Sequence, residues 1–271
     1  MRIFLACLLL GFLKFSVAGD VFNQTQPRQF TLADQLEPNA TIGGYPIWQG
    51  ENKWRIWNIR TRHSVGTAQS IPIGDIGLFQ TEGKKFIATM TVSANLAQGA
   101  SAGWSDEPCK RDDMLYKINL GRDLWNENCL TVNHTTGFPG NPGGRGAELN
   151  ALFMESGVDV PPTIIQVAFS RMGPNSRMYR VVLNINPELA GIARETETQW
   201  GRSRWHKSTS FRDAEKKQLI DDLVQWATPF AQQMEVAYQK KGGAFESIPT
   251  WRSILEKQGV VVTSKPKVLL D

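Results

Sequence analysis

The segment that decides the fold is Ile165-Gln-Val-Ala-Phe-Ser-Arg-Met-Gly-Pro-Asn-Ser-Arg-Met-Tyr-Arg-Val-Val-Leu-Asn-Ile185. Apolar residues alternate with polar or small residues on both sides of the turn sequence Gly173-Pro-Asn-Ser176. A period of two residues is that of a β-strand with one face on the core. Two such runs joined by a short turn predict an antiparallel hairpin over residues 165–185.

A second hairpin is predicted earlier in the chain, over residues 71–93. Its second arm alternates an apolar face with a mostly hydroxylic face, and the apolar residues are Phe86, Ala88, Met90 and Val92. Its first arm contains Pro72, Gly74 and Gly77, which favour an edge strand or a bulge. Further strands are expected over residues 53–63 and 130–132.

A long amphipathic helix is predicted from Asp213 to Lys241. Apolar residues recur at steps of three and four between Leu219 and Tyr238, which gives one apolar stripe. Asp213 suits the beginning of a helix, and Pro229 is expected to kink it. Shorter helices are expected over residues 147–156 and 250–258, followed by a strand over residues 260–262.

These elements predict an α+β protein with a mainly antiparallel sheet, built from hairpins and packed by the long C-terminal helix. Residues 53–271 are expected to form a single α+β domain. Residues 19–52 are rich in turn-forming residues and are expected to be an irregular N-terminal segment. The order of elements resembles that of the αβα sandwiches of the photosystem extrinsic-subunit type. No motif accompanies this resemblance, so it implies no function.

Residues 1–18 have the pattern of a secretory signal peptide. Arg2 supplies a positive charge, residues 3–15 are mostly apolar, and Ser16-Val-Ala18 matches a cleavage site. The apolar run is shorter than the roughly 20 residues that span a bilayer, and Lys14 interrupts it. We therefore expect an exported protein with no transmembrane anchor after cleavage, periplasmic in a Gram-negative bacterium and otherwise secreted.

Cys109 and Cys129 are the cysteines that remain after this cleavage. An exported protein meets oxidising conditions, so we expect them to form a disulfide. Closing a loop of about 20 residues contributes roughly 3 kcal/mol in the chain-entropy model. Neither cysteine belongs to a CxxC motif and only His134 is a nearby further ligand, so no metal site is expected.

The charge balance gives no sign of nucleic-acid binding. The chain has 30 Lys and Arg against 26 Asp and Glu, and removal of Arg2 and Lys14 leaves 28 against 26. A net charge of +2 with no block of five like charges does not suit a nucleic-acid partner. HExxH, EF-hand and phosphate-loop motifs are absent, and no cofactor is expected.

Four residues are candidates for catalysis. Asp112 and Asp113 follow two basic residues, so a loop held by local ion pairs is favoured over acid–base chemistry. His134 and His206 are far apart in sequence, and each suits a structural or exposed position as well as a functional one. If the four residues meet in space, they predict a hydrolase of an unfamiliar type.

The segment 200–207 is the most unusual polar and aromatic stretch. Its two tryptophans and its basic residues can stack on a sugar or clamp an anion, and the candidate ligand-binding residues are Trp200, Arg202, Arg204 and Trp205. The alternative is a loop that pins tryptophans onto the core. A glycine-rich loop over residues 137–146 leads into the helix at 147–156, where Arg145 is a further candidate for anion binding.

The sequence therefore favours a non-catalytic exported protein that binds a small ligand or a protein partner in the cell envelope. The two alternatives are a hydrolase using His134, Asp112 or Asp113, and His206, and an anion or glycan binder using the segment 200–207.

Overall fold

The computed structural model describes residues 16–17, 20–24, 34–50, 53–63, 70–97, 108–121, 126–139, 146–240 and 250–257. Most of the predicted signal peptide, Arg145 and the strand expected over residues 260–262 lie outside these residues. Among the described helices, none is both long enough and apolar enough to cross a bilayer.

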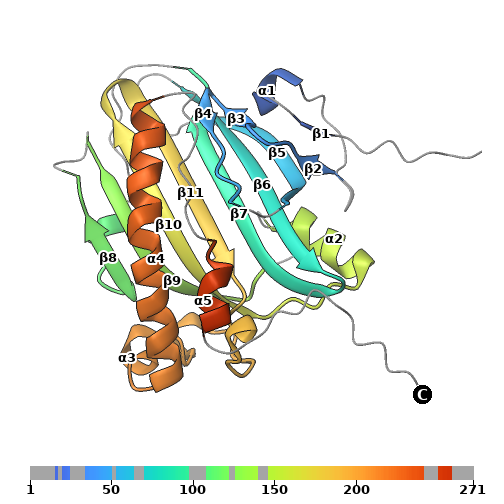
Figure 1. Ribbon diagram of the computed structural model, residues 1–271, viewed down its shortest axis with the longest axis vertical. Coiled ribbons are helices and arrows are strands. Elements are labelled where there is room, and N and C mark those ends of the chain that lie inside the picture. Colours follow the sequence, from blue (N-terminus) through green and yellow to red (C-terminus); the bar gives the residue numbers. More distant parts are fainter. Residues whose placement is uncertain are drawn as a thin grey trace, which may run out of the picture.

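A mainly antiparallel sheet organises the described chain (Figure 1). Its strand order is β1-β2-β5-β6-β7-β11-β10-β9-β8, and each neighbouring pair is antiparallel except β1 and β2. The strands are β1 (Ser16–Val17), β2 (Gln35–Leu36), β5 (Arg55–His63), β6 (Pro72–Glu82), β7 (Lys85–Asn95), β8 (Tyr116–Asn119), β9 (Asn128–Thr136), β10 (Thr163–Gly173) and β11 (Arg177–Ile185). A separate pair is formed by β3 (Thr41–Ile42) and β4 (Tyr45–Pro46).

The helices complete the α+β fold that the sequence predicts. The α-helices are α1 (Val21–Gln24), α2 (Ala147–Ser156), α3 (Lys207–Ser210), α4 (Ala214–Gln239) and α5 (Arg252–Lys257). The 3₁₀ turns are η1 (Pro108–Lys110), η2 (Pro174–Ser176), η3 (Pro187–Ala190) and η4 (Trp200–Arg202). The predicted hairpins correspond to β6–β7 and β10–β11, and α4 continues through Pro229.

Helices cover both faces of the sheet. The long helix α4 lies across β9 and β10 (Figure 1), and its buried residues, including Leu223 and Phe230, join the main core cluster. Helix α2 packs on the opposite face, because Phe153 shares a second cluster with Phe79, whereas the neighbouring Leu78 belongs to the main core. The side chains of one strand therefore alternate between two apolar layers.

The face predicted for Phe86 is wrong. Phe86 lies in the cluster around α2, while Ala88 belongs to the core under α4. A register shift between Gln80 and Thr81 in the β6–β7 pair accounts for this change of face. Strand β6 is also not an edge strand, since it lies between β5 and β7. Its Gly77 gives room to Trp57, because a Cβ atom there would lie 2.3 Å from the indole.

The N-terminal segment takes part in the main core. Its described part contains short strands, and the rings of Tyr45 and Trp48 are 0% and 2% exposed. Trp48 packs edge-on against Phe230 of α4, with ring centroids 5.1 Å apart. Strand β1 lies within the predicted signal peptide, so cleavage after residue 18 would leave β2 at this edge of the sheet.

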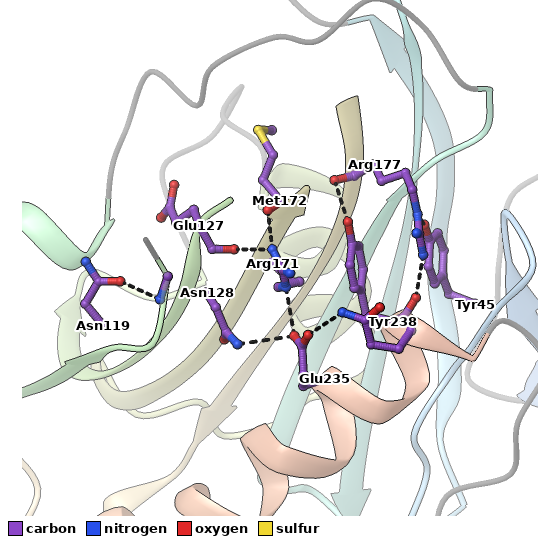
Figure 2. A network of polar contacts seen from close by, with 11 residues as sticks. Tyr45, Asn119, Glu127, Asn128, Arg171, Met172, Arg177, Glu235 and Tyr238 are labelled. Atoms are coloured by element: carbon purple, nitrogen blue, oxygen red, sulfur yellow. Dashed lines mark hydrogen bonds and ion pairs between the residues drawn. The ribbon is translucent and has the colours of Figure 1, made fainter. Parts of the chain in front are cut away.

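The C-terminal end of α4 is attached to the β10–β11 hairpin by two arginines (Figure 2). Arg171 donates a hydrogen bond to Glu235 at 2.8 Å, and its guanidinium carbon lies 4.7 Å from the centre of the Tyr238 ring. Arg177 lies 4.5 Å from the centre of the same ring and donates to the Tyr238 carbonyl at 2.7 Å. Tyr45 stacks against Tyr238, so the network joins three distant segments.

Glu127 contacts this network through its main chain, and its carboxylate is buried beside it. Its carbonyl accepts a hydrogen bond from Arg171 at 3.0 Å (Figure 2). Glu127 is 7% exposed, and within the described residues neither carboxylate oxygen has a hydrogen-bonding partner. Burial raises the pKa of this carboxyl group, and the positive charges of Arg180 and Lys110 oppose that rise. A negative charge at this position therefore costs stability.

The predicted disulfide between Cys109 and Cys129 is present, with the two Cα atoms 5.7 Å apart. It joins η1 to β9, and the loop that it closes contains the edge strand β8.

Candidate functional site

The fold brings the four candidate catalytic residues into one region beside the end of β9. His134 lies on β9, His206 directly precedes α3, and Asp112 and Asp113 lie in the bend before β8. Lys207 links the last two of these segments, because its ammonium group donates a hydrogen bond to the Asp112 carbonyl at 3.0 Å. The charge of Asp113 acts on both imidazoles.

Three rings form the centre of this region, which we call the His134–Trp200–His206 cluster. His134 stacks on Trp200 with ring centroids 5.0 Å apart, and His206 meets Trp200 edge-on at 4.7 Å. The two imidazole centroids are 6.3 Å apart, well short of the sum of those two distances. The imidazoles therefore do not sandwich the indole, and one face of Trp200 remains outside the cluster.

Reciprocal hydrogen bonds fix the His134–Trp200 pair. Nε2 of His134 lies 3.4 Å from the Trp200 carbonyl, and Nε1 of Trp200 donates to the His134 carbonyl at 3.2 Å. Since a carbonyl oxygen only accepts, Nε2 of the neutral His134 ring carries the proton. Nδ1 is then the unprotonated nitrogen, and it is buried with no hydrogen-bonding partner among the residues that the structure describes.

His134 is held in its neutral form. The residue is 2% exposed, and this burial lowers its pKa from 6.5 to about 4. The hydrogen bond to Trp200 opposes the decrease in pKa, as do the charges of Glu195 and Asp113, while His206 reinforces it. Above its pKa the ring is an uncharged stacking partner for Trp200.

His206 serves as the N-terminal cap of α3. Its Nδ1 accepts a hydrogen bond from the Ser208 backbone N–H at 3.3 Å and lies 2.8 Å from the Ser208 hydroxyl oxygen. The hydroxyl group of Ser208 belongs to none of the motifs that the sequence contains for catalysis or binding. The available signal is its position two residues after a histidine that precedes a helix, where short polar residues bond to the backbone.

The two aspartates are held by local ion pairs. Arg111 binds both carboxylate oxygens of Asp113, at 2.9 and 2.6 Å, and Lys117 donates to Asp112 at 2.8 Å. These hydrogen bonds are the main reason why the pKa of each carboxyl group lies below its ordinary value. Each aspartate thus has its own cation, and neither donates to or accepts from a histidine.

The basic and aromatic residues of 200–207 divide between surface and core. Arg202 and Arg204 are exposed, and in the described residues their guanidinium groups have no ion pair or hydrogen bond. Trp205 is 1% exposed and joins the main core, with the Lys216 ammonium group 5.6 Å from its ring centre. The alternative of a tryptophan pinned onto the core therefore describes Trp205, while Trp200 is partly exposed.

Glu195 fixes the turn that presents these residues. Its carboxylate accepts a hydrogen bond from the Ser203 hydroxyl at 3.0 Å and from the Arg204 backbone N–H at 2.6 Å. A buried carboxylate with two donors is a strong local anchor. The segment therefore has a fixed backbone from which the arginine side chains project.

The region combines the partly exposed indole of Trp200 with the exposed guanidinium groups of Arg202 and Arg204. It contains no set of three potential metal ligands, and none occurs elsewhere in the described ranges. Comparisons with protein-family models, with curated proteins and with solved structures found no match to this chain.

Proposed function

We propose that this chain is an exported, non-catalytic binding protein whose ligand is an anionic sugar or a similar flat, negatively charged group. In this proposal the ligand stacks on Trp200 and meets Arg202 and Arg204. The protein is periplasmic in a Gram-negative bacterium and otherwise secreted, as the N-terminal pattern predicts.

The observation that supports this proposal best is the way Trp200 is held. Its indole is fixed by stacking on His134 and by two reciprocal hydrogen bonds, while one of its faces lies outside the cluster. A ring that is fixed before binding loses little conformational freedom when a ligand stacks on it. Exposed arginines in the following turn add charge and hydrogen-bond donors for an anion.

The disulfide is consistent with export. Disulfides persist in oxidising compartments and are rare in the cytosol. Mass spectrometry of protein recovered from the envelope or the medium should give a chain that begins at Gly19. A full-length chain with Arg2 and Lys14 retained would contradict the proposed processing.

Binding is tested by calorimetric titration of the mature protein with an acidic hexasaccharide, oligogalacturonate, and with the neutral maltohexaose. We expect the acidic sugar to bind and both Trp200→Ala and the double variant Arg202→Gln/Arg204→Gln to weaken binding at least about tenfold, which is about 1.4 kcal/mol. Trp200→Phe keeps an aromatic ring and should retain most of the affinity. Arg212→Gln, a change at an exposed arginine outside the segment, is the matched control.

Equal binding by all of these folded variants would contradict a role for the segment 200–207. Absence of binding to both sugars would contradict a carbohydrate ligand, and the proposal would then fail as stated.

A hydrolase remains the second candidate, supported by the Ser208–His206 contact of 2.8 Å. A hydroxyl within hydrogen-bonding distance of an imidazole is the arrangement that activates a serine nucleophile. A fluorophosphonate probe should then label Ser208, and Ser208→Ala or His206→Gln should abolish labelling. Absence of labelling in the folded wild-type protein would remove this candidate.

A further inference from the structure

A row of charged and hydroxyl side chains crosses the sheet on the face that also packs α2. The backbone register pairs Arg60 with Asp75, Asp75 with Ser93, and Ser93 with Arg180. Directly paired residues in antiparallel strands project from the same face. Arg62 is two residues from Arg60 on the same strand, so it joins this face. The row therefore has more positive than negative side chains.

Arg60 and Arg62 converge on one oxygen atom. Nε of Arg60 lies 3.3 Å from Oδ2 of Asp75, and Nε of Arg62 lies 2.9 Å from the same oxygen. Ser93 donates a hydrogen bond to the other oxygen, Oδ1, at 2.5 Å. Asp75 is 4% exposed and is therefore fixed, so it holds the two guanidinium groups side by side.

The terminal nitrogens of this pair have no hydrogen-bonding partner among the described residues. The side chains of Arg60 and Arg62 are 38% and 39% exposed, and within the described residues only their Nε atoms are engaged in hydrogen bonds or ion pairs. Arg194 has the same side-chain exposure of 38%, but it is bound by two carboxylates, those of Glu188 and Asp159. The guanidinium groups of Arg60 and Arg62 thus share one carboxylate, that of Asp75. The guanidinium group of Arg194 has two carboxylates to itself.

We propose that Arg60 and Arg62 form a binding site for an oxyanion group, such as a phosphate, sulfate or carboxylate on a small ligand. The planar donor fork of arginine matches such groups, and two adjacent forks can hold one anion through their terminal nitrogens. Asp75 neutralises one of the two positive charges and leaves a net charge of +1 on the three side chains. The site is independent of the segment 200–207, since it involves β5 to β7 and the other site does not.

The test is a calorimetric titration of the mature protein with inorganic phosphate, with sulfate and with acetate. Sodium chloride keeps the ionic strength constant in each titration. We expect saturable phosphate binding that Arg60→Gln and Arg62→Gln each weaken at least tenfold. Arg60→Lys keeps the charge but lacks the fork, and it should weaken binding less than Arg60→Gln. Each variant leaves one arginine on Asp75, so the buried carboxylate keeps a partner.

Arg194→Gln is the matched control and should leave phosphate affinity unchanged. Binding of phosphate and sulfate without acetate would identify a tetrahedral anion, and binding of acetate as well would extend the site to carboxylates. Two results would overturn the proposal. One is that no anion binds more strongly than chloride, and the other is that phosphate affinity survives in both glutamine variants. Because Arg202 and Arg204 are unchanged in these proteins, failure here leaves the proposed function untouched.

Discussion

Replacement of His134 by Phe should remove a large part of the acid sensitivity of this protein. Phenylalanine preserves a flat ring that can stack on Trp200, and it cannot take up a proton. Burial lowers the pKa of His134 from 6.5 to about 4. Between these values the unfolded chain holds a proton on His134 and the folded chain does not. Acid therefore favours unfolding in this pH range.

The size of the effect follows from the two pKa values. A change of one pKa unit corresponds to about 1.4 kcal/mol, so the difference between 6.5 and about 4 gives up to about 3 kcal/mol. This stabilisation is fully present above pH 6.5. It is lost progressively as the pH falls towards about 4, below which both states are protonated.

The assay is urea unfolding of wild type and His134→Phe at pH values from 7.5 to about 4, compared as the difference between the two proteins at each pH. The wild type should lose up to about 3 kcal/mol more than the variant over this range. Substitution of the exposed His63 by Phe controls for the loss of a histidine as such. Parallel pH profiles for wild type and His134→Phe would refute the reasoning.

Four further predictions concern the core, the sheet and the cysteines. Glu127→Gln should stabilise the protein at pH 7 by roughly 1 kcal/mol or more, because the buried carboxylate has no hydrogen-bonding partner in the described part of the chain. Since folding raises the pKa of Glu127, this advantage should vanish below the ordinary value of 4.5, and an unchanged advantage at pH 4 would contradict it. Phe230→Ala should lower the free energy of unfolding by about 3–5 kcal/mol, whereas Phe211→Ala, at a residue 39% exposed, should cost much less; similar losses in chemical denaturation would mean that the helix face is misassigned. Gly173→Ala should cost about 1–3 kcal/mol, because its Cβ atom would lie 2.1 Å from the Tyr238 hydroxyl, while Gly201→Ala enters open space and is the control in the same thermal unfolding experiment. Thiol titration of the denatured, unreduced mature protein should detect no free thiol, and two thiols per chain would exclude the Cys109–Cys129 bond in solution.

The elements of the fold are predictable because their signals are local. The hairpin over residues 165–185 and the helix predicted to end at Lys241 follow from periods of two and of three to four residues. The face of Phe86 is not predictable in this way, because it depends on a register shift between two strands. The edge position suggested for β6 fails for a related reason: its glycines make room for side chains of other segments, such as Trp57.

The candidate site is predictable by residue type and not by arrangement. His134, His206 and Trp200 stand out as chemically unusual residues, but their contact depends on the path that the chain takes after β11. Ser208 has a local signal as part of a helix cap. The Arg60–Arg62 pair alternates visibly along one strand, yet its shared partner Asp75 is set by the pairing of β5 with β6.

The disulfide has a consequence for solubility. It closes the loop that contains β8, and β8 is the strand that covers the outer edge of β9. A strand of four residues, Tyr116–Asn119, has few backbone hydrogen bonds of its own with which to stay in place. Reduction would therefore let β8 detach and expose the hydrogen-bonding edge of β9, which is buried and rich in β-forming residues. In a reducing compartment this protein would therefore be prone to associate with other copies through the exposed edge of β9. The Cys109–Cys129 disulfide prevents this polymerisation.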